Sequence, residues 1–389
     1  MISTFTLSME PDDYRSPRIG RRIKVHEHTG TIRYIGEVQD TRGIWLGIEW
    51  DDPARGKHSG QKDGRQLVSP FSIFSLRVAG TGSFIRPSPS ISYGQSFLHA
   101  LISKYVDLPH TTGHKETVIL GSSNGAIEVE AVGLDKVRAK LARFERLREI
   151  SLDVDEVAWA DPLGDIKKAC PNVRSLDLSN SLLPSWDMVA LIAAELSALR
   201  ALSLNCNRFS TLTDTKIMHA SFLGLKELRV DQTMISWPEV ITLTSVMPNI
   251  EYLEVGYNDM KILGGTAFQN YTSATKLKIL NFDGNELEEW SDVMMSTASF
   301  TTCIFIHASI LMISTNEWIR LYDSLERLIL TSNRIRRIML AEPKKAILNI
   351  KHIGLQDNLL SSWHDIDALN EWVPELQTLN ISGNPLVSG

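Results

Sequence analysis

The side chains best suited to recognition chemistry lie near the N-terminus. Lys57 and Arg86 carry positive charges that can meet carboxylates. Trp45 and Phe84 offer large apolar rings that can wall a slot for an aromatic group. Glycines such as Gly56 let a peptide backbone approach closely. These residue types suit a carboxylate-bearing peptide, although Trp45 and Phe84 would equally serve as the core of a small β domain.

Sequence patterns typical of catalysis are missing. His110 and His114 flank Thr-Thr-Gly in an expected loop without nearby Cys or paired carboxylates, so we interpret them as solvated side chains. The glycine clusters GTGS and GSSNG do not match the phosphate-binding pattern GxxxxGK[ST], and no GxSxG occurs. The cysteines Cys170, Cys206 and Cys303 are far apart and form no CxxC. We expect no enzyme activity, no metal and no cofactor.

Composition indicates a folded, intracellular protein. The chain has 389 residues, of which 43% are hydrophobic and 22% charged, which is ordinary globular usage for two or three domains. Its formal net charge of -6 argues against a nucleic-acid binder. The N-terminus carries acids where a secretory signal needs positive charge, and the longest apolar run, residues 303–313, is too short to span a membrane.

An internal repeat dominates the larger part of the chain. The pattern L-x-x-L-x-L-x-x-N-x-L, with apolar substitutions, recurs at a nearly constant step. The nine copies begin at Leu147, Val173, Leu199, Leu225, Ile250, Leu277, Leu325, Ile350 and Leu376. Apolar residues two apart lie on one face of a strand. The usual step of roughly 26 residues predicts a leucine-rich repeat solenoid, whose parallel strands line its concave side.

Two further residue columns follow the repeat. Asparagine fills the same position in six copies, as Asn207, Asn258, Asn285, Asn333, Asn358 and Asn384. Its amide can satisfy the backbone where the chain bends away from the strand. Tryptophan recurs at a nearly fixed distance after the start of five copies, as Trp159, Trp186, Trp237, Trp290 and Trp363. We interpret both columns as structural and assign them no ligand.

The outward-facing strand positions are mostly acidic in the first six copies. The acids are Glu149, Asp153, Asp177, Glu227, Asp231, Glu254 and Asp283, and Arg229 is the basic exception. This pattern predicts an acidic concave surface suited to a basic patch on a partner. A merely solvated face explains the same pattern equally well.

One step in the repeat is irregular. The interval between the copies at Leu277 and Leu325 is almost twice the usual step, and residues 294–315 lack turn residues and the motif asparagine. The extra segment is a degenerate repeat, an insertion, or sequence foreign to the mature chain. The last motif ends just before Gly389, with no polar cap for the final strand, so we expect an incomplete chain.

A different module precedes the repeats. Residues 18–87 combine Gly-rich turns with short β-type runs and predict a small antiparallel barrel. Residues 88–132 read as a Ser/Gly-rich, partly ordered linker. Residues 133–146 have helical apolar spacing and predict an N-terminal cap on a solenoid that covers residues 133–389. The predicted fold class is therefore multidomain, an all-β barrel followed by an α/β solenoid.

The stretch GIWLGIEWDDPARGKHSG, with GTGSFIRP after it, resembles the CAP-Gly domain family across residues 18–87. CAP-Gly domains bind acidic C-terminal tails that end in an aromatic residue, as in α-tubulin. The resemblance implies a peptide site made of Trp45, Gly56, Lys57, His58, Ser59, Gly60, Phe84 and Arg86. The family loop usually reads GKNDG, so its acidic residue is absent here, and the stretch after Gly64 lacks the usual Tyr-Phe strand.

The order of a CAP-Gly domain and leucine-rich repeats resembles the tubulin-folding cofactor E family. That family normally adds a ubiquitin-like domain, before which this chain stops. The resemblance implies a cytoplasmic, cytoskeleton-associated chaperone that binds α-tubulin and other tubulin-folding cofactors and assembles or dissociates the α/β heterodimer. The alternatives are a microtubule adaptor with the same two modules and, further off, a regulator of a small GTPase.

Overall fold

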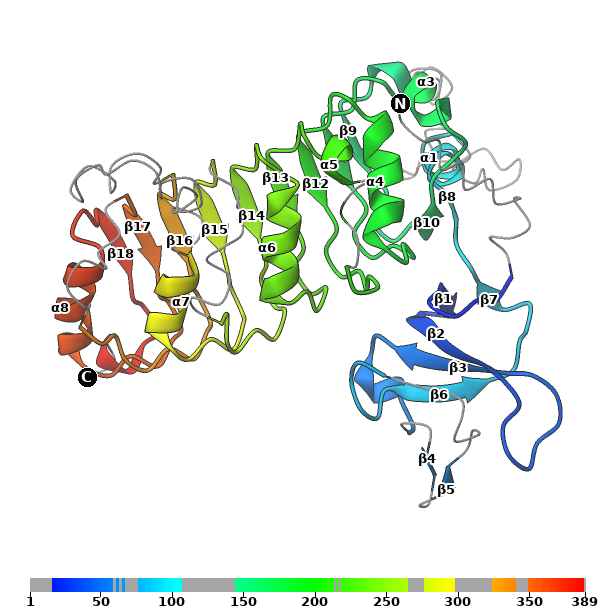
Figure 1. Cartoon of the computed structure of the whole chain (residues 1–389), viewed down its shortest axis with the longest axis horizontal. Helices are drawn as coiled ribbons and strands as arrows, with labels where there is room; N and C mark the ends of the chain where they lie inside the picture. Colours follow the sequence, from blue (N-terminus) through cyan, green and yellow to red (C-terminus); the bar gives the residue numbers. More distant parts are fainter. Residues whose placement is uncertain are drawn as a thin grey trace, which may run out of the picture.

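The computed structural model describes residues 16–58, 61–62, 65–66, 76–106, 144–212, 215, 218–264, 276–297, 324–340 and 349–387. Within these residues the chain forms a small N-terminal sheet domain, up to residue 92, and a long repeat array, residues 144–387 (Figure 1). In the array, the strands stand side by side and the helices lie along one side of them (Figure 1). None of the helices in the described ranges combines the length and hydropathy needed to cross a membrane.

The sheet domain is one antiparallel sheet in the order β6-β3-β2-β1-β7. Alternate residues of β3 point inward, so Leu46 and Ile48 pack on Ile23 and Ile32 in the core. Within the described part of the chain no ladder joins the edge strands β6 and β7, so the predicted barrel is observed as an open sheet. The strands are β1 (Arg22–Val25), β2 (His28–Gly36), β3 (Trp45–Trp50), β6 (Gly82–Ile85) and β7 (Ile91–Ser92), with a separate hairpin of β4 (Gln61–Lys62) and β5 (Arg65–Gln66).

A buried ion pair holds the first strand to the end of the third. Arg22 is only 1% exposed and pairs with Asp51 through both guanidinium nitrogens. Arg22 also donates to Thr31 Oγ1 at 3.0 Å, and Thr29 Oγ1 donates to Asp51 at 2.7 Å. Burial raises the pKa of Asp51, but the Arg22 charge and these hydrogen bonds outweigh burial and lower it.

The start of the predicted linker is ordered and packed. Within residues 88–132 the chain forms β7, β8 (Gln95–Ser96) and α1 (Phe97–Tyr105). Ser96 caps the helix by accepting a hydrogen bond from His99 N at 3.2 Å. Phe97 and Leu101, one turn apart, are buried in the core of the array. Residues 91–105 thus form regular elements within the partly ordered linker that the sequence predicts. The predicted cap 133–146 lies outside the described residues except for the turn η3 (Phe144–Arg146).

Nine parallel strands form the sheet of the array, one for each predicted repeat. Each strand begins two residues after a motif start, and its middle residue points into the core, as Leu176 and Leu202 do. The flanking residues form the exposed face of the sheet. In chain order the strands are β9 (Glu149–Ser151), β11 (Ser175–Asp177), β12 (Ala201–Ser203), β13 (Glu227–Arg229), β14 (Tyr252–Glu254), β15 (Ile279–Asn281), β16 (Arg327–Ile329), β17 (His352–Gly354) and β18 (Thr378–Asn380).

The irregular interval adds no strand to this sheet. Although their motifs start far apart, at Leu277 and Leu325, β15 pairs directly with β16, and Leu280 lies opposite Leu328. An extra repeat would have placed its own strand between them. The direct pairing of β15 with β16 argues against a degenerate repeat with its own strand between them. Residues 298–323 lie outside the described ranges.

The asparagine column ties neighbouring repeats together. Asn207 is fully buried, and its amide nitrogen donates to the carbonyl oxygens of Leu178 and Leu204, each at 2.9 Å. Its amide oxygen accepts a hydrogen bond from Ser181 N at 3.1 Å. One side chain thus satisfies backbone groups of two repeats that have no strand partner at the bend.

Tryptophans begin the longer helices of the array. Ser185 and Ser236 precede two of them as N-caps. Trp186 packs on Phe209 with 4.8 Å between ring centroids, which confirms its predicted structural role. Trp363 departs from this pattern, because 61% of its surface is exposed. The helices are α3 (Asp165–Ala169), α4 (Trp186–Glu195), α5 (Met218–Ser221), α6 (Trp237–Ser245), α7 (Trp290–Thr297) and α8 (Trp363–Trp372), with the turns η2 (Pro53–Arg55) and η8 (Pro385–Val387).

Candidate peptide-binding site

A row of three residues crosses the sheet domain. In the strand register, Gly47 of β3 lies opposite both Tyr34 of β2 and Phe84 of β6. Because Gly47 has no side chain, the rings of Tyr34 and Phe84 meet across it edge to face, with 5.8 Å between centroids. The row lies on the face opposite the core residues Leu46 and Ile48, and within it Phe84 is half-buried while Tyr34 is only 8% exposed.

The loop after η2 adds His58 to this row. The backbone nitrogens of Lys57 and His58 both donate to the Gly82 carbonyl, at 2.8 and 3.1 Å. This bridge places the His58 ring against Phe84, with 5.2 Å between centroids and 30° between planes. Gly56 makes the close crossing possible, because a Cβ atom there would lie 2.1 Å from the Gly80 carbonyl oxygen.

A cation–π pair, Arg86 on Trp45, lies on the same face. Trp45 lies two residues before Gly47 and therefore points to the same side of β3. The Arg86 guanidinium covers the Trp45 ring at 4.0 Å from its centroid, in cation–π geometry. The Trp45 indole nitrogen donates to Thr41 Oγ1 at 2.7 Å, and this bond fixes the plane of the ring.

The structure places most of the predicted peptide-site residues on this face. It brings Trp45 to Arg86 and Phe84 to His58, and Lys57 is exposed beside His58. Neither Trp45 nor Phe84 belongs to the sheet domain's core cluster. Ser59 and Gly60 lie outside the described residues.

Sequence reasoning missed Tyr34. The strand pairing could have identified it, because Tyr34 is the residue of β2 that lies opposite Gly47. We call Tyr34, Trp45, His58, Phe84 and Arg86, together with Lys57, the aromatic–cationic face.

The predicted acidic residues lie along the exposed face of the array sheet. Glu149, Asp177, Glu227 and Glu254 belong to strands β9, β11, β13 and β14. Arg229, the basic exception in the first six repeats, is not free, because it pairs with Glu227 at 2.6 Å and with Glu254 at 3.2 Å. Two of the carboxylates are thereby partly neutralised.

Several of the aspartates also have structural roles. Asp231 accepts a hydrogen bond from Gly256 N at 2.6 Å, and Asp283 accepts one from Thr331 N at 3.0 Å, each in the next repeat. Asp177 accepts from Ser179 N at 2.9 Å. These contacts stabilise the bends after three of the strands and give these aspartates a structural role.

Asp153 receives a further contact of this kind, from the amide nitrogen of Asn180 at 2.9 Å. Burial raises the pKa of Asp231 to about 6, and the charges of Glu254 and Asp283 add to the increase despite the opposing Gly256 hydrogen bond. The acidic face is therefore less charged than the count of its carboxylates suggests.

The described residues offer little for metal or nucleophilic chemistry. Across the described ranges no group of three His, Cys, Asp or Glu side chains is arranged to hold a metal ion. Cys170 is buried, and burial together with Glu195 and Asp161 raises the pKa of its thiol to about 12. A thiol with this pKa is a poor nucleophile at neutral pH. Cys303 lies outside the described residues.

Comparison with known proteins defines the class of the sheet domain. Residues 19–89 match the CAP-Gly domain model, so the chain contains a CAP-Gly domain, whose aromatic–cationic face is described above.

Over 95% of its length the chain is also similar to tubulin-specific chaperone E. It is 30% identical to the bovine protein over 378 residues and 30% identical to the human protein over 375 residues. It is 28% identical to tubulin-folding cofactor E of Arabidopsis thaliana over 382 residues. The chain spans 64 to 65% of the length of these relatives. The resemblance to the tubulin-folding cofactor E family is confirmed.

Proposed function

We propose that this chain is a tubulin-folding cofactor, a chaperone without enzyme activity that assists α-tubulin folding and the assembly and dissociation of the α/β heterodimer. The similarity to tubulin-specific chaperone E along 95% of the chain supports this role. Its partners would be α-tubulin and other tubulin-folding cofactors, and it would work in the cytoplasm alongside the cytoskeleton.

The aromatic–cationic face is the observation that carries the proposal for the CAP-Gly domain. Trp45 lies on β3, two residues before Gly47, and Phe84 lies on β6, opposite Gly47. The two rings are therefore two strand positions apart on the same face, with room for an aromatic group of the ligand between them. Arg86 and Lys57 supply charges for carboxylates. This arrangement suits the acidic, aromatic-ended tail of α-tubulin. Arg86 would keep its stacking on Trp45 while its outer nitrogens pair with the tail.

We further propose that the repeat array is a leucine-rich repeat solenoid that holds the remainder of the client. One short strand per repeat, buried asparagines at each bend and a period of roughly 26 residues support this class. The exposed acidic face of its sheet would contact a basic patch on the client.

A pull-down with tubulin tests the tail-binding step. The bait is the full chain, and the prey is α-tubulin with or without its final aromatic residue. We expect the form with the aromatic residue to be captured several-fold more efficiently, because its ring fills the slot beside Phe84. Equal capture of the two forms would refute tail recognition.

A second measurement separates a chaperone from an adaptor. The amount of soluble α/β heterodimer is followed after the full chain is added to purified tubulin together with the other cofactors. A changed dimer fraction is expected of a folding cofactor. An unchanged fraction with intact tail binding would favour a microtubule adaptor.

A further inference from the structure

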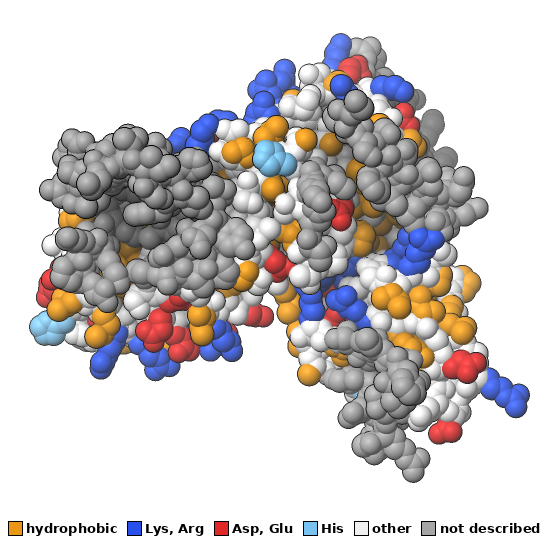
Figure 2. Space-filling model, in the orientation of Figure 1, with side chains coloured by type: hydrophobic (Ala, Val, Ile, Leu, Met, Phe, Trp, Pro, Cys, Tyr) orange, Lys and Arg blue, Asp and Glu red, His pale blue; other side chains and the backbone are white. Residues whose placement is uncertain are grey.

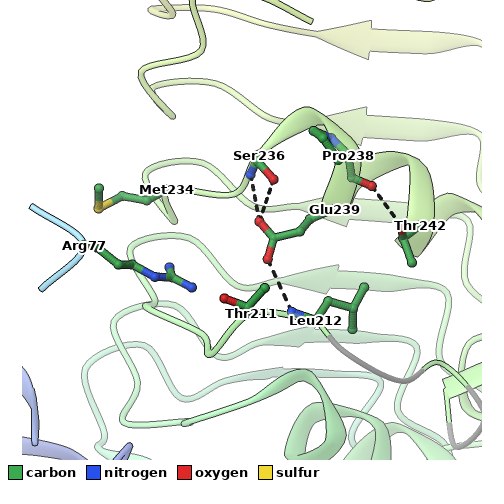
Figure 3. A pocket seen from close by; sticks show the side chains of 8 residues that line it. All are labelled: Arg77, Thr211, Leu212, Met234, Ser236, Pro238, Glu239 and Thr242. Atoms are coloured by element: carbon green, nitrogen blue, oxygen red, sulfur yellow. Dashed lines mark hydrogen bonds between the residues drawn. The ribbon is translucent and has the colours of Figure 1, made fainter. Parts of the chain in front are cut away.

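A cavity of about 500 Å³ lies between the CAP-Gly domain and the repeat array. Arg77 reaches it from the segment before β6, while Thr211, Met234 and Thr242 line it from two consecutive repeats (Figure 3). Neither the aromatic–cationic face nor the acidic face of the array takes part in it. Its volume falls within the range typical of ligand sites.

The position of Arg77 in this cavity is fixed through its backbone. Arg77 N and Val78 N both donate to Glu49 Oε1, the latter at 3.2 Å. Arg33 holds the other Glu49 oxygen at 2.7 Å, and Glu49 is buried. With its backbone held, the Arg77 side chain extends toward Thr211 and the N-terminal turn of α6 (Figure 3).

A second arginine of the array, Arg208, does not line the cavity but is bonded to Gln232, two residues before the lining residue Met234. The Arg208 guanidinium donates to the carbonyl oxygens of Asn207, at 3.0 Å, and of Gln232. Burial lowers the pKa of Arg208, the charge of Asp51 opposes that effect, and the charges of Arg22 and Arg77 add to it. An arginine nevertheless stays charged at neutral pH.

Arg208 lies near two other arginines and one aspartate at this junction. The charge of Arg208 interacts with those of Arg22, Arg77 and Asp51, and Asp51 is already paired with Arg22. Figure 2 shows Lys and Arg side chains gathered where the two domains meet. Arg77, which is exposed, and Arg208 therefore leave positive charge beside the cavity.

Glu239, the one acid among the described residues that line the cavity, is already hydrogen-bonded within the protein. Glu239 accepts hydrogen bonds from Ser236 N at 3.1 Å and Ser236 Oγ at 2.8 Å, and from Leu212 N at 3.4 Å. It also lies in the first turn of α6, where the helix dipole offsets its charge. It is thus a weak competitor for the guanidinium of Arg77.

Apolar side chains complete the wall. Met234, Leu212 and Pro238 line the cavity next to the polar groups. Methionine adapts to the shape of an apolar partner. An arginine fork beside an adaptable apolar surface fits a carboxylate followed by an aliphatic side chain.

We propose that this interdomain cavity binds an acidic segment of a partner protein, with Arg77 pairing with its carboxylates, Arg208 adding positive charge nearby, and Met234 packing on an adjacent aliphatic side chain. The partner need not present a free C-terminus, because the aromatic–cationic face lies elsewhere in the CAP-Gly domain. The choice of a tubulin segment as the natural occupant rests on the proposed function, whereas the site itself does not.

Fluorescence anisotropy of the full chain with a labelled peptide of alternating Glu and Val, amidated at its C-terminus, tests the site. We expect saturable binding that weakens by roughly tenfold or more in Arg77→Glu. Thr242→Trp, which fills the cavity, should weaken binding similarly. The matched charge reversal Arg336→Glu, at an exposed position outside the cavity, should leave affinity within about twofold.

Lys57→Glu separates this site from the tail site, since it should reduce capture of tubulin tails but leave the amidated peptide bound. Denaturant unfolding of each variant verifies that it is folded. The proposal is overturned if the wild-type chain does not bind the peptide, if Arg77→Glu matches Arg336→Glu, or if Lys57→Glu abolishes peptide binding. Inorganic phosphate that competes as well as free peptide would show a general anion site instead. The peptide assay and the tubulin pull-down are separate measurements on the wild-type chain, so a failure of the cavity proposal leaves the test of the proposed function unaffected.

Discussion

The His58 ring distinguishes this CAP-Gly domain from relatives with the usual GKNDG loop. An asparagine side chain offers hydrogen bonds at this position, whereas His58 stacks on Phe84 and Phe84 contacts Tyr34 in turn. His58 and Phe84 together form a wider apolar surface than Phe84 alone, and the buried Tyr34 ring supports Phe84 from below. Backbone hydrogen bonds to Gly82 fix the position of His58 in its loop, so the His58 ring is held in place before a peptide binds.

Replacing His58 tests whether that ring takes part in tail recognition. We expect His58→Ala to weaken binding of an aromatic-ended acidic peptide by roughly tenfold, because part of the wall is lost. The same peptide without its aromatic residue should be affected much less. Titration calorimetry with both peptides measures the difference, and His364→Ala, at a highly exposed position, is the control. Equal losses for the two peptides would rule out a role in reading the aromatic group.

Asp231 makes stability depend on pH through its surroundings. Burial, with Glu254 and Asp283 nearby, raises its pKa from 3.8 to about 6. The folded state then binds a proton more tightly than the unfolded state. This group's contribution to stability is fully present below about pH 4 and is lost as the pH rises through about 6.

Asp231→Asn should therefore stabilise the chain at pH 7.5 by about 1 kcal/mol, a value reduced for solvent screening at this partly exposed site. The difference should vanish near pH 4, where the wild-type carboxyl is protonated. Urea unfolding of both proteins across this pH range provides the comparison. A loss of stability that is the same at every pH would instead indicate a weakened hydrogen bond to Gly256.

At the scale of elements, the bend after each strand depends on its buried asparagine. Asn258 donates to the carbonyl oxygens of Val230 and Gly256, both at 3.0 Å. Its oxygen accepts hydrogen bonds from Thr233 N at 2.8 Å and Ile235 N at 3.3 Å. These are backbone groups of neighbouring repeats with few other partners inside the array.

Asn258→Ala should lower the free energy of unfolding by about 3 kcal/mol, because several buried donors and acceptors lose their partner at once. Asn172→Ala removes one exposed hydrogen bond, to Glu145 O, and should cost well under half as much. Urea denaturation followed by circular dichroism compares the two variants. Similar losses would mean that the asparagine column adds little to the array.

The elements of the array could be predicted from the sequence because each repeat makes its contacts with the next one along the chain. The spacing of Leu176 and Leu178 locates a strand, and Asn207 locates the bend that follows the next strand. Helix α1 escaped prediction for the opposite reason. Phe97 and Leu101 lie in a Ser/Gly-rich stretch, and they bury against repeats much further along the chain. Local periodicity carries no signal for such a contact.

The functional residues also fall into a group that the sequence predicts and a group that it does not. Trp45, Lys57, Phe84 and Arg86 follow from motif spacing, because a short loop and two paired strands position them. The cavity beside Arg77 depends on how two domains dock. Such docking depends on scattered residues with no common spacing, so no sequence pattern predicts it.

At the scale of the whole molecule, the two domains are closely coupled. Only Tyr93 and Gly94 separate β7 of the CAP-Gly sheet from β8, which pairs with β10 (Val157–Trp159) of the array. Gly94 has a φ of +83°, and a Cβ atom there would lie 2.6 Å from Ala158 Cβ. The crossing is short and requires glycine.

Side chains reinforce this short crossing. Glu156 of the array pairs with Lys24 of β1 at 2.9 Å and accepts a hydrogen bond from Ser92 Oγ at 2.5 Å. Arg208 and Asp51 attract each other across the same boundary. A fixed docking would hold the aromatic–cationic face and the array in one orientation toward a shared client, which lowers the entropic cost of binding at both surfaces.

The double variant Glu156→Gln/Arg208→Gln should release this docking while leaving each domain folded. We expect its radius of gyration in small-angle X-ray scattering to exceed that of the wild-type chain at low salt. Because roughly 1 M salt screens the same charges, it should expand the wild-type chain toward the variant but change the variant little. The control Lys226→Gln/Lys278→Gln removes two pairs with Glu251 inside the array and should scatter like the wild type. If the double variant and the wild type scatter identically at both salt concentrations, the short glycine crossing alone fixes the orientation of the domains.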